Sequence, residues 1–308
     1  MKKTIITALV LLAIAGALSL GAQSKTTLKF AERDTCSLYM DLYMPSDTTL
    51  ATRTRPLVIF IFGGGFQNGT RDSKGYVPWF EALCAHGYPV ASIDYRLGLK
   101  GIEYKMSLDF VSKLEKAIDI AVEDLFSATN YILDNARALG LEGRGIVVSG
   151  SSAGALTSLQ AEYYLANGDP KAAPLPQGFN YAGVMAFSGA IFSRVGGVKY
   201  SGEPCPQLLL HGTADRMVPY RQIKIFNLCL GGSSHIAKRL KKQGCNYQIL
   251  RFDGNYHEIC VSMMHNLGRE LAFLRRNVER GEKTVIDALI SDPSIPVPDW
   301  AKNPAVGE

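Results

Sequence analysis

The chain has 308 residues, a hydrophobic fraction of 47% and a formal net charge of +5. This length is sufficient for one large domain with a sizeable core. The charge is modest, and the one basic run, residues 238–242, is interpreted as a solvated helix face, so no nucleic-acid partner is expected.

Residues 1–22 have the features of a secretory signal peptide. Lys2 and Lys3 precede a nearly continuous apolar stretch, residues 5–20, and the small residues Gly21 and Ala22 follow it. Cleavage after Ala22 is expected to release the protein to the periplasm or the medium; an uncleaved membrane anchor is the alternative. No later stretch is apolar for long enough to span a bilayer, so no membrane association is expected after cleavage.

Strand-like and helix-like segments alternate along the rest of the chain. This alternation predicts an α/β domain over residues 23–283, with a mostly parallel central sheet and helices on both faces. Residues 284–308 contain Pro293, Pro296, Pro298 and Pro304 and are predicted to form an extended C-terminal tail, with Trp300 as a packing anchor. The predicted strands are residues 26–44 (two strands), 56–61, 89–95, 145–149, 181–188, 206–211 and 247–252, and the helices include 76–86 and 113–139.

Three consecutive glycines, residues 63–65, follow the buried strand 56–61 directly. Glycines cost chain entropy on folding, so a run of three needs a structural reason. Close approach of backbone N–H groups to a developing oxyanion is one such reason, and a flexible turn is the alternative.

Gly150-Ser151-Ser152-Ala153-Gly154 lies between an apolar strand and a helix-favouring stretch. A sharp turn of this G-x-S-x-G kind holds a serine hydroxyl out of its own backbone, and small neighbours leave room for the turn. Ser152 is therefore the candidate nucleophile, with a Gly/Ser loop without chemistry as the alternative.

An acid and a base follow in chain order. Asp215 lies in the loop after strand 206–211, where it can orient a histidine from a neighbouring loop or cap a helix beginning near residue 218. Of the five histidines, only His257 combines a position after the last predicted strand with a glycine-containing loop; His211 ends an apolar strand and is interpreted as structural. The order Ser152, Asp215, His257 is the one expected for an α/β-hydrolase.

These motifs resemble those of α/β-hydrolase-fold carboxylesterases of the hormone-sensitive-lipase-like and secreted bacterial esterase group. The resemblance covers roughly residues 28–280 and implies a serine esterase whose oxyanion donors are the N–H groups of Gly64, Gly65 and Ala153. It implies no cofactor. Phe62 stands where the family usually has a histidine before the glycines, which is a departure from the pattern. The other residues that carry the resemblance are Asp41 to Pro45, Asp94 to Leu97, and His211 to Asp215.

The predicted reaction is hydrolysis of short-chain esters, acetyl or feruloyl esters of carbohydrates among them, through an acyl-enzyme. A peptidase of the prolyl-oligopeptidase kind and a non-catalytic binding protein on the same fold are the alternatives. The partner is a small-molecule or carbohydrate-linked ester, and the sequence does not indicate an oligomeric state.

Two further features remain open at this stage. Residues 98–110 lengthen the loop after strand 89–95 and either cover the site or simply pack against the domain. The six cysteines show no C-x-x-C or zinc-like spacing, so no metal site is expected, and Cys205 and Cys245, which begin neighbouring strands, are one candidate disulfide pair.

Overall fold

The computed structural model describes residues 24–46, 55–105 and 107–302. The predicted signal peptide, residues 1–22, lies outside them. Nine strands form the central sheet in the order β1-β2-β4-β3-β5-β6-β8-β11-β12. All neighbouring strands from β4 to β12 run parallel, and β2 is antiparallel to both β1 and β4. The strands are β1 (Ser24–Arg33), β2 (Cys36–Met44), β3 (Leu57–Ile61), β4 (Val90–Ile93), β5 (Ile146–Ser151), β6 (Gly183–Phe187), β8 (Gln207–Gly212), β11 (Tyr247–Phe252) and β12 (Val285–Ile290).

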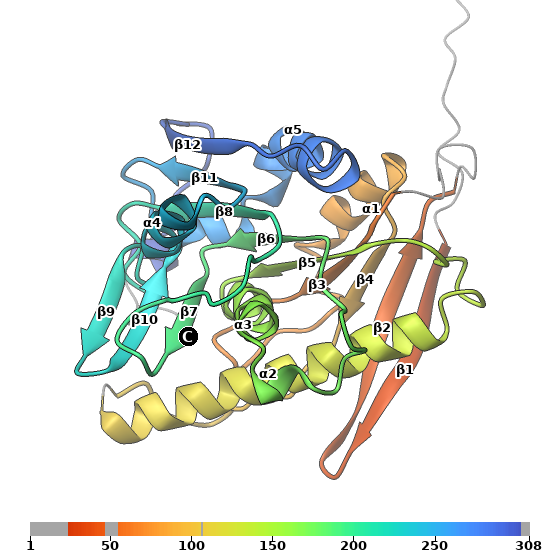
Figure 1. Ribbon diagram of the computed structural model, residues 1–308, viewed down its shortest axis with the longest axis horizontal. Helices are drawn as coiled ribbons and strands as arrows, with labels where there is room; N and C mark the ends of the chain where they lie inside the picture. Colours follow the sequence, from red (N-terminus) through yellow and green to blue (C-terminus); the bar gives the residue numbers. More distant parts are fainter. Residues whose placement is uncertain (1–23, 47–54, 106, 303–308) are drawn as a thin grey trace, which may run out of the picture.

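Helices cover both faces of this sheet (Figure 1). The helices α1 (Val77–Ala85) and α5 (Met263–Phe273) lie on one face, and α2 (Leu108–Asp134) and α3 (Ala153–Asn167) lie on the other. A further helix, α4 (Ser233–Gln243), packs against β8 and β11. Every residue of β3, β5 and β6 is buried, which explains why these strands are continuous apolar runs. The predicted architecture is confirmed.

The long helix α2 begins and ends about five residues earlier than the predicted span, 113–139. Ser107 fixes its start, because the Ser107 hydroxyl accepts a hydrogen bond from the N–H of Phe110. The helix ends at a C-cap, Asn135, and turns carry the chain on to Gly140, whose φ is +69°. Gly140 therefore lies at the end of the turns that follow the helix, and the connection to β5 continues to residue 145.

A second, small sheet was not predicted. Its three antiparallel strands have the order β7-β10-β9 and are β7 (Ala190–Ser193), β10 (Leu228–Gly232) and β9 (Gln222–Ile225). The strand β7 begins directly after Gly189. No helix begins near residue 218, since β9 follows that segment.

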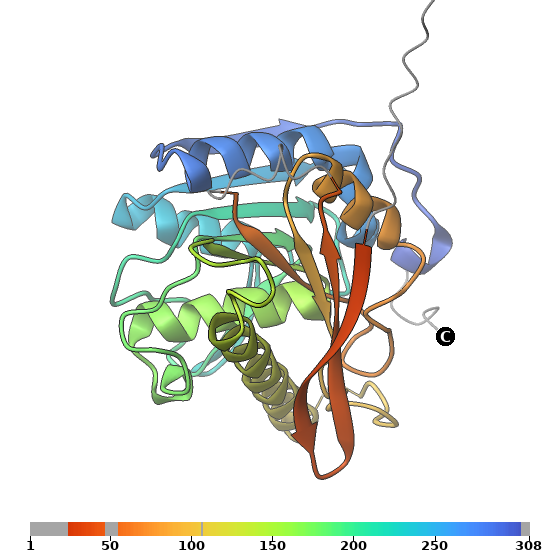
Figure 2. The same ribbon diagram turned by 90° about the vertical axis from the view of Figure 1, so that its right-hand side faces the viewer.

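The C-terminal segment differs from the predicted tail. Residues 285–290 form β12, which pairs in parallel with β11, so the central sheet continues past the predicted boundary at residue 283. The chain then leaves the sheet and descends along one side of the molecule to a short helix, α6 (Asp299–Lys302) (Figure 2). The tail is thus extended in part but belongs to the domain.

Cys205 and Cys245 each precede one of two paired strands, as expected, since Gln207 of β8 is in register with Tyr247 of β11. Both residues are thiols in the structure, and no disulfide joins them. In the part of the chain that the structure describes, none of the helices has both the length and the apolar character needed to cross a bilayer.

Candidate active site

Ser152 lies at the sharp turn between β5 and α3. Its φ is 50° and its ψ is −114°, a backbone conformation that residues other than glycine rarely adopt. A Cβ atom on Gly154 would lie 2.0 Å from the carbonyl oxygen of Ile61, and one on Gly150 would lie 2.2 Å from the carbonyl carbon of Gly154. The glycines of the G-x-S-x-G sequence are therefore required by contact, and the turn presents Ser152 at the carboxyl edge of the sheet.

The structure brings the three predicted residues together. The Nε2 atom of His257 lies 2.8 Å from the Ser152 hydroxyl, and its Nδ1 atom lies 2.7 Å from Oδ2 of Asp215. Asp215 follows β8 and His257 follows β11, so both come from loops at the same edge as Ser152. The side chains of Asp215 and His257 are almost completely buried. A continuous chain of hydrogen bonds thus links a serine hydroxyl to a buried carboxylate.

His211, interpreted from the sequence as structural, belongs to the same network. Its Nε2 atom lies 3.2 Å from Oδ2 of Asp215 and 3.2 Å from the carbonyl oxygen of Val218. Both of these oxygens can only accept, so Nε2 carries a hydrogen and donates it. The other ring nitrogen, Nδ1, lies 2.8 Å from the hydroxyl of Ser233. The apolar strand that contains His211 gave no sign of this contact.

Asp215 has further donors in its own loop. Its Oδ1 atom accepts hydrogen bonds from the N–H groups of Met217 and Val218, at 2.9 and 3.0 Å. Asp215 therefore does make the local backbone contacts considered in the sequence, but they close a tight turn rather than begin a helix. Both carboxylate oxygens are held in place, which fixes the direction in which Oδ2 faces His257.

The electrostatics of the pair follow from these contacts. Burial raises the pKa of Asp215, but hydrogen bonds from His211 and His257 outweigh burial and hold that pKa well below its usual range. Burial lowers the pKa of His257, whereas Cys260 and Asp215 outweigh burial and raise that pKa above its usual value. Because its own pKa is held low, Asp215 is ionised throughout the neutral range. Asp215 therefore stabilises the cationic form of His257.

The glycine segment lies beside the serine. A Cβ atom on Gly63 would lie 3.3 Å from Cβ of Ser152. Gly64 and Gly65 have φ values of 119° and 62°, which glycine adopts readily. Within the described residues, the N–H groups of Gly64, Gly65 and Ala153 donate to no other protein group. Three N–H donors are thus available in the two segments that meet at Ser152.

Phe62, which stands in place of the family's usual histidine, has a packing role. Its ring stacks on Tyr95 at a centroid distance of 4.5 Å, and the Tyr95 hydroxyl donates to the carbonyl oxygen of Phe62 at 3.1 Å. The Phe62–Tyr95 contacts therefore fix the position of the residue that immediately precedes the glycine segment. The neighbouring Asp94 and Arg96 form ion pairs with Arg71 and Asp124, respectively.

A polar network beneath the serine joins three of these loops. The Ser151 hydroxyl donates to the carbonyl oxygen of Cys260 at 2.7 Å, and the N–H of Gly63 donates to the Tyr76 hydroxyl at 3.4 Å. The Tyr76 hydroxyl also contacts Ser151. Ser151 and Tyr76 therefore connect the turn that carries Ser152, the glycine segment and the loop that carries His257.

The loop over residues 98–105 packs on the glycine segment. The Tyr104 hydroxyl donates to the carbonyl oxygen of Gly65 at 2.8 Å, and the Gln67 side chain donates to the carbonyl oxygen of Ile102 at 2.7 Å. Tyr104 is itself 60% exposed. These contacts show that the loop packs against the domain, and residues 108–110 of the predicted segment belong to α2. A cover over the site stays a prediction.

The remaining histidines lie elsewhere. His86 is the C-cap of α1, and His235 and His265 lie in α4 and α5, respectively. No group of three or more metal-ligating side chains occurs among the residues that the structure describes.

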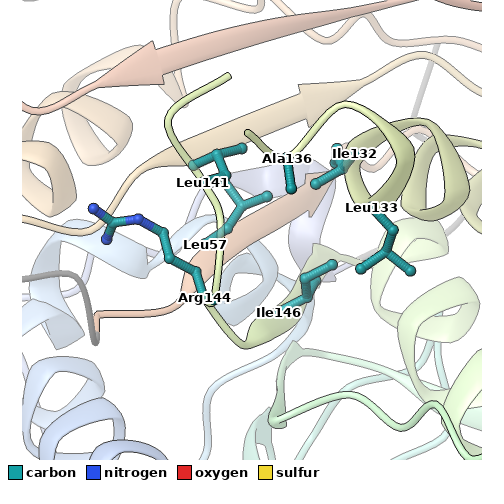
Figure 3. Close-up of a pocket in the computed structure, with 8 residues that line it drawn as sticks. Leu57, Ile132, Leu133, Ala136, Leu141, Arg144 and Ile146 are labelled. Carbon is teal, nitrogen blue, oxygen red and sulfur yellow. The ribbon is translucent and has the colours of Figure 1, made fainter. Parts of the chain in front are cut away.

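The cavity shown in Figure 3 is distinct from this site. It has a volume of about 60 Å³, and its lining includes Leu57, Ile132 and Ile146. Leu57 and Ile146 are the first residues of β3 and β5, whereas Ser152 follows the last residue of β5. The cavity therefore lies at the opposite edge of the sheet.

Comparisons with known proteins agree with this geometry. Residues 40–170 match the BD-FAE family model. The chain is 28% identical over 120 residues to fumonisin B1 esterase of Sphingopyxis macrogoltabida, a match that covers 38% of this chain and 21% of that protein. It is 26% identical over 172 residues to secreted lipase 1 of Botryotinia fuckeliana, covering 55% of this chain and 27% of that one. The chain thus spans about a quarter of the length of these curated relatives.

Solved structures match over most of the chain. The propionate-bound form of the esterase Est2 from Thermogutta terrifontis superposes with a TM-score of 0.55 at 20% identity, covering 81% of this chain and 95% of that one. The native form of Est2 superposes with a TM-score of 0.57 at 20% identity, covering 81% and 91%. The strand order, the turn at Ser152 and these superpositions together show that the protein has the α/β-hydrolase fold.

Proposed function

We propose that the protein is a serine carboxylesterase that hydrolyses esters of short-chain acids. The observation that carries the proposal is the unbroken chain of hydrogen bonds from Ser152 through His257 to Asp215, beside three N–H donors. A buried carboxylate in such a chain has a chemical use, because it stabilises the charge that a general base acquires. The esterases and lipases among the similar proteins agree with this reaction class.

The reaction begins when Nε2 of His257 takes the proton of the Ser152 hydroxyl. The Ser152 oxygen then forms a bond to the ester carbonyl carbon, and the N–H groups of Gly64, Gly65 and Ala153 bind the oxyanion that develops. His257 returns the proton to the alcohol oxygen as the bond between carbonyl carbon and alcohol breaks. Water repeats these steps on the acyl-enzyme and releases the acid.

Two observations support a short acyl group. The Tyr104 hydroxyl donates to the carbonyl oxygen of Gly65, so the Tyr104 side chain occupies space beside one of the proposed oxyanion donors. Two structures of the similar esterase Est2 are propionate-bound and butyrate-bound forms. We further propose, from the signal-like residues 1–22, that the protein acts outside the cytoplasm, where acetyl or feruloyl esters of carbohydrates are a suitable substrate class.

The test is hydrolysis of p-nitrophenyl esters from acetyl to dodecanoyl by the purified protein and its Ser152→Ala variant. We expect turnover that is greatest at acetyl to butyryl and that falls at least about 10³-fold in the variant. A prolyl p-nitroanilide, measured in parallel, tests the peptidase alternative. Turnover of the anilide but not of the esters, or ester turnover that the variant retains, would show the proposal to be wrong.

A further inference from the structure

Trp300 lies against His257. The centroids of the two rings are 6.4 Å apart and their planes meet at 86°, an edge-to-face arrangement. The short helix α6, which carries Trp300, packs on the segment His257–Val261. His257 is only 3% exposed, while Trp300 is partly buried and keeps part of its surface open. The hydrolysis proposed above makes no use of this residue.

The tail reaches the site along a defined path. Because β12 and β11 are parallel, they end at the same edge of the sheet, and the N–H of Asp253 donates to the carbonyl oxygen of Ile290 at 2.8 Å. A turn at Asp292 then redirects the chain, with the N–H of Ser294 donating to the Asp292 carboxylate at 3.0 Å. Figure 2 shows this segment leaving the sheet.

Two buried residues anchor the tail on either side of the open indole. Ile295 is 5% exposed and Ala301 is completely buried. The N–H of Ala301 also donates to the carbonyl oxygen of Pro298 at 3.1 Å. Ile295 and Ala301 therefore hold the segment that carries Trp300 against the domain, while the Trp300 ring packs on His257.

We infer that Trp300 is a specificity-determining residue that contacts the alcohol part of the ester, and that this alcohol carries a ring with a flat apolar face. The inference rests on the proposed function and deepens it. It assigns to the C-terminal segment a part of the substrate site, and it names the substrate class as esters of sugars or other cyclic alcohols rather than of linear ones.

The reaction geometry places the alcohol beside Trp300. His257 must return a proton to the alcohol oxygen, so that oxygen comes within about 3 Å of Nε2. The substituent on the oxygen then lies next to the imidazole, within reach of a ring whose centroid is 6.4 Å away. The acyl carbonyl oxygen is directed to Gly64, Gly65 and Ala153. Since Trp300 packs on the imidazole that protonates the alcohol, it is positioned to contact the alcohol part rather than the carbonyl oxygen.

An indole suits a cyclic alcohol for two reasons. Its face offers a broad apolar surface for the C–H face of a sugar or for an aromatic ring, and its N–H can donate to a hydroxyl. A linear alkyl alcohol covers less of that face. If Trp300 only shielded His257 from water, its loss would slow the hydrolysis of every ester alike, and this difference separates the two roles.

The experiment compares three acetates that share one acetyl-enzyme, so that kcat/KM reports the alcohol part alone. Benzyl acetate, an acetylated methyl xyloside and ethyl acetate are assayed with the parent protein, Trp300→Ala and Trp300→Phe. Phe226→Ala is the matched control, because Phe226 is an aromatic residue that is 87% exposed at the turn between β9 and β10. Thermal unfolding of each variant verifies that it is folded.

We expect Trp300→Ala to lower kcat/KM about tenfold for the ring-bearing esters and less than about twofold for ethyl acetate. Trp300→Phe should retain most of the activity on benzyl acetate, and Phe226→Ala should match the parent. A selective loss on benzyl acetate alone identifies an aromatic alcohol, and one on the xyloside alone identifies a sugar. An equal loss on all three esters, or no loss, overturns the inference. A parent protein that hydrolyses none of them overturns the proposed function itself.

Discussion

Replacement of His211 tests whether the carboxylate network extends beyond the three predicted residues. His211 donates through Nε2, which is shared between Asp215 and Val218 at 3.2 Å each. A hydrogen bond to a charged group contributes about 1.5–3 kcal/mol, and a shared bond of this length belongs at the lower end, about 1.5 kcal/mol. Since a factor of ten in rate corresponds to about 1.4 kcal/mol, we expect His211→Leu to lower kcat/KM roughly tenfold.

The assay pairs this variant with His211→Gln, which keeps an N–H donor at a similar reach. Urea unfolding at pH 7 should show His211→Leu destabilised by at least about 1.5 kcal/mol, with His211→Gln closer to the parent. The pH profile of kcat/KM separates positioning of Asp215 from a general loss of packing, because a less firmly held carboxylate raises the pKa of His257 less. The acid limb should then move to lower pH in His211→Leu. The reasoning is refuted if both variants lose stability equally and the acid limb does not move.

Three other substitutions test separate parts of the structure. Asp215→Asn should lower kcat/KM by about 10⁴-fold and shift the acid limb to lower pH, because the carboxylate that raises the pKa of His257 is gone; an unmoved limb in a pH–rate profile would contradict this. Burial raises the pKa of Glu162 to about 7, so the folded state holds this proton more tightly than the unfolded chain and stability falls as pH rises from about 4.5 to 7. Urea unfolding should therefore show Glu162→Gln more stable than the parent by about 3 kcal/mol at pH 8 but not at pH 4.5, and an equal difference at both values would argue against it. Gly154→Ala places a Cβ atom 2.0 Å from the carbonyl oxygen of Ile61 and should cost about 3 kcal/mol or prevent folding, whereas a parent-like melting temperature would show that the turn can relax.

The parts of the fold that local patterns encode could be predicted from the sequence. The buried strands β3, β5 and β6 are continuous apolar runs because helices cover both faces of the sheet, and that signal needs no tertiary information. The small second sheet lacked such a signal. All four residues of β9 are exposed, and β10 ends in two glycines, so neither strand shows the pattern of a buried strand.

The candidate site likewise has residues that the sequence predicts and residues that it does not. Ser152, Asp215 and His257 each follow a strand that the sequence reveals, and parallel strands bring their ends to one edge. The contacts of His211 and Trp300 depend on how the chain turns after the strands end. His211 contacts Asp215 from the end of the apolar strand β8, and Trp300 reaches His257 only because the chain reverses after β12. Neither arrangement leaves a periodic trace in the sequence.

The close contacts at Gly150 and Gly154 bear on what the G-x-S-x-G sequence means as a signature. These two positions exclude larger residues on steric grounds alone, whether or not Ser152 reacts. A descendant of this protein that lost its activity would still need both glycines to keep the turn, so the signature would persist as a record of backbone shape. His257 and Asp215 carry no comparable steric requirement of their own fold. Retention or loss of Asp215 and His257, and not of the glycines, would therefore indicate whether a related protein has kept the activity.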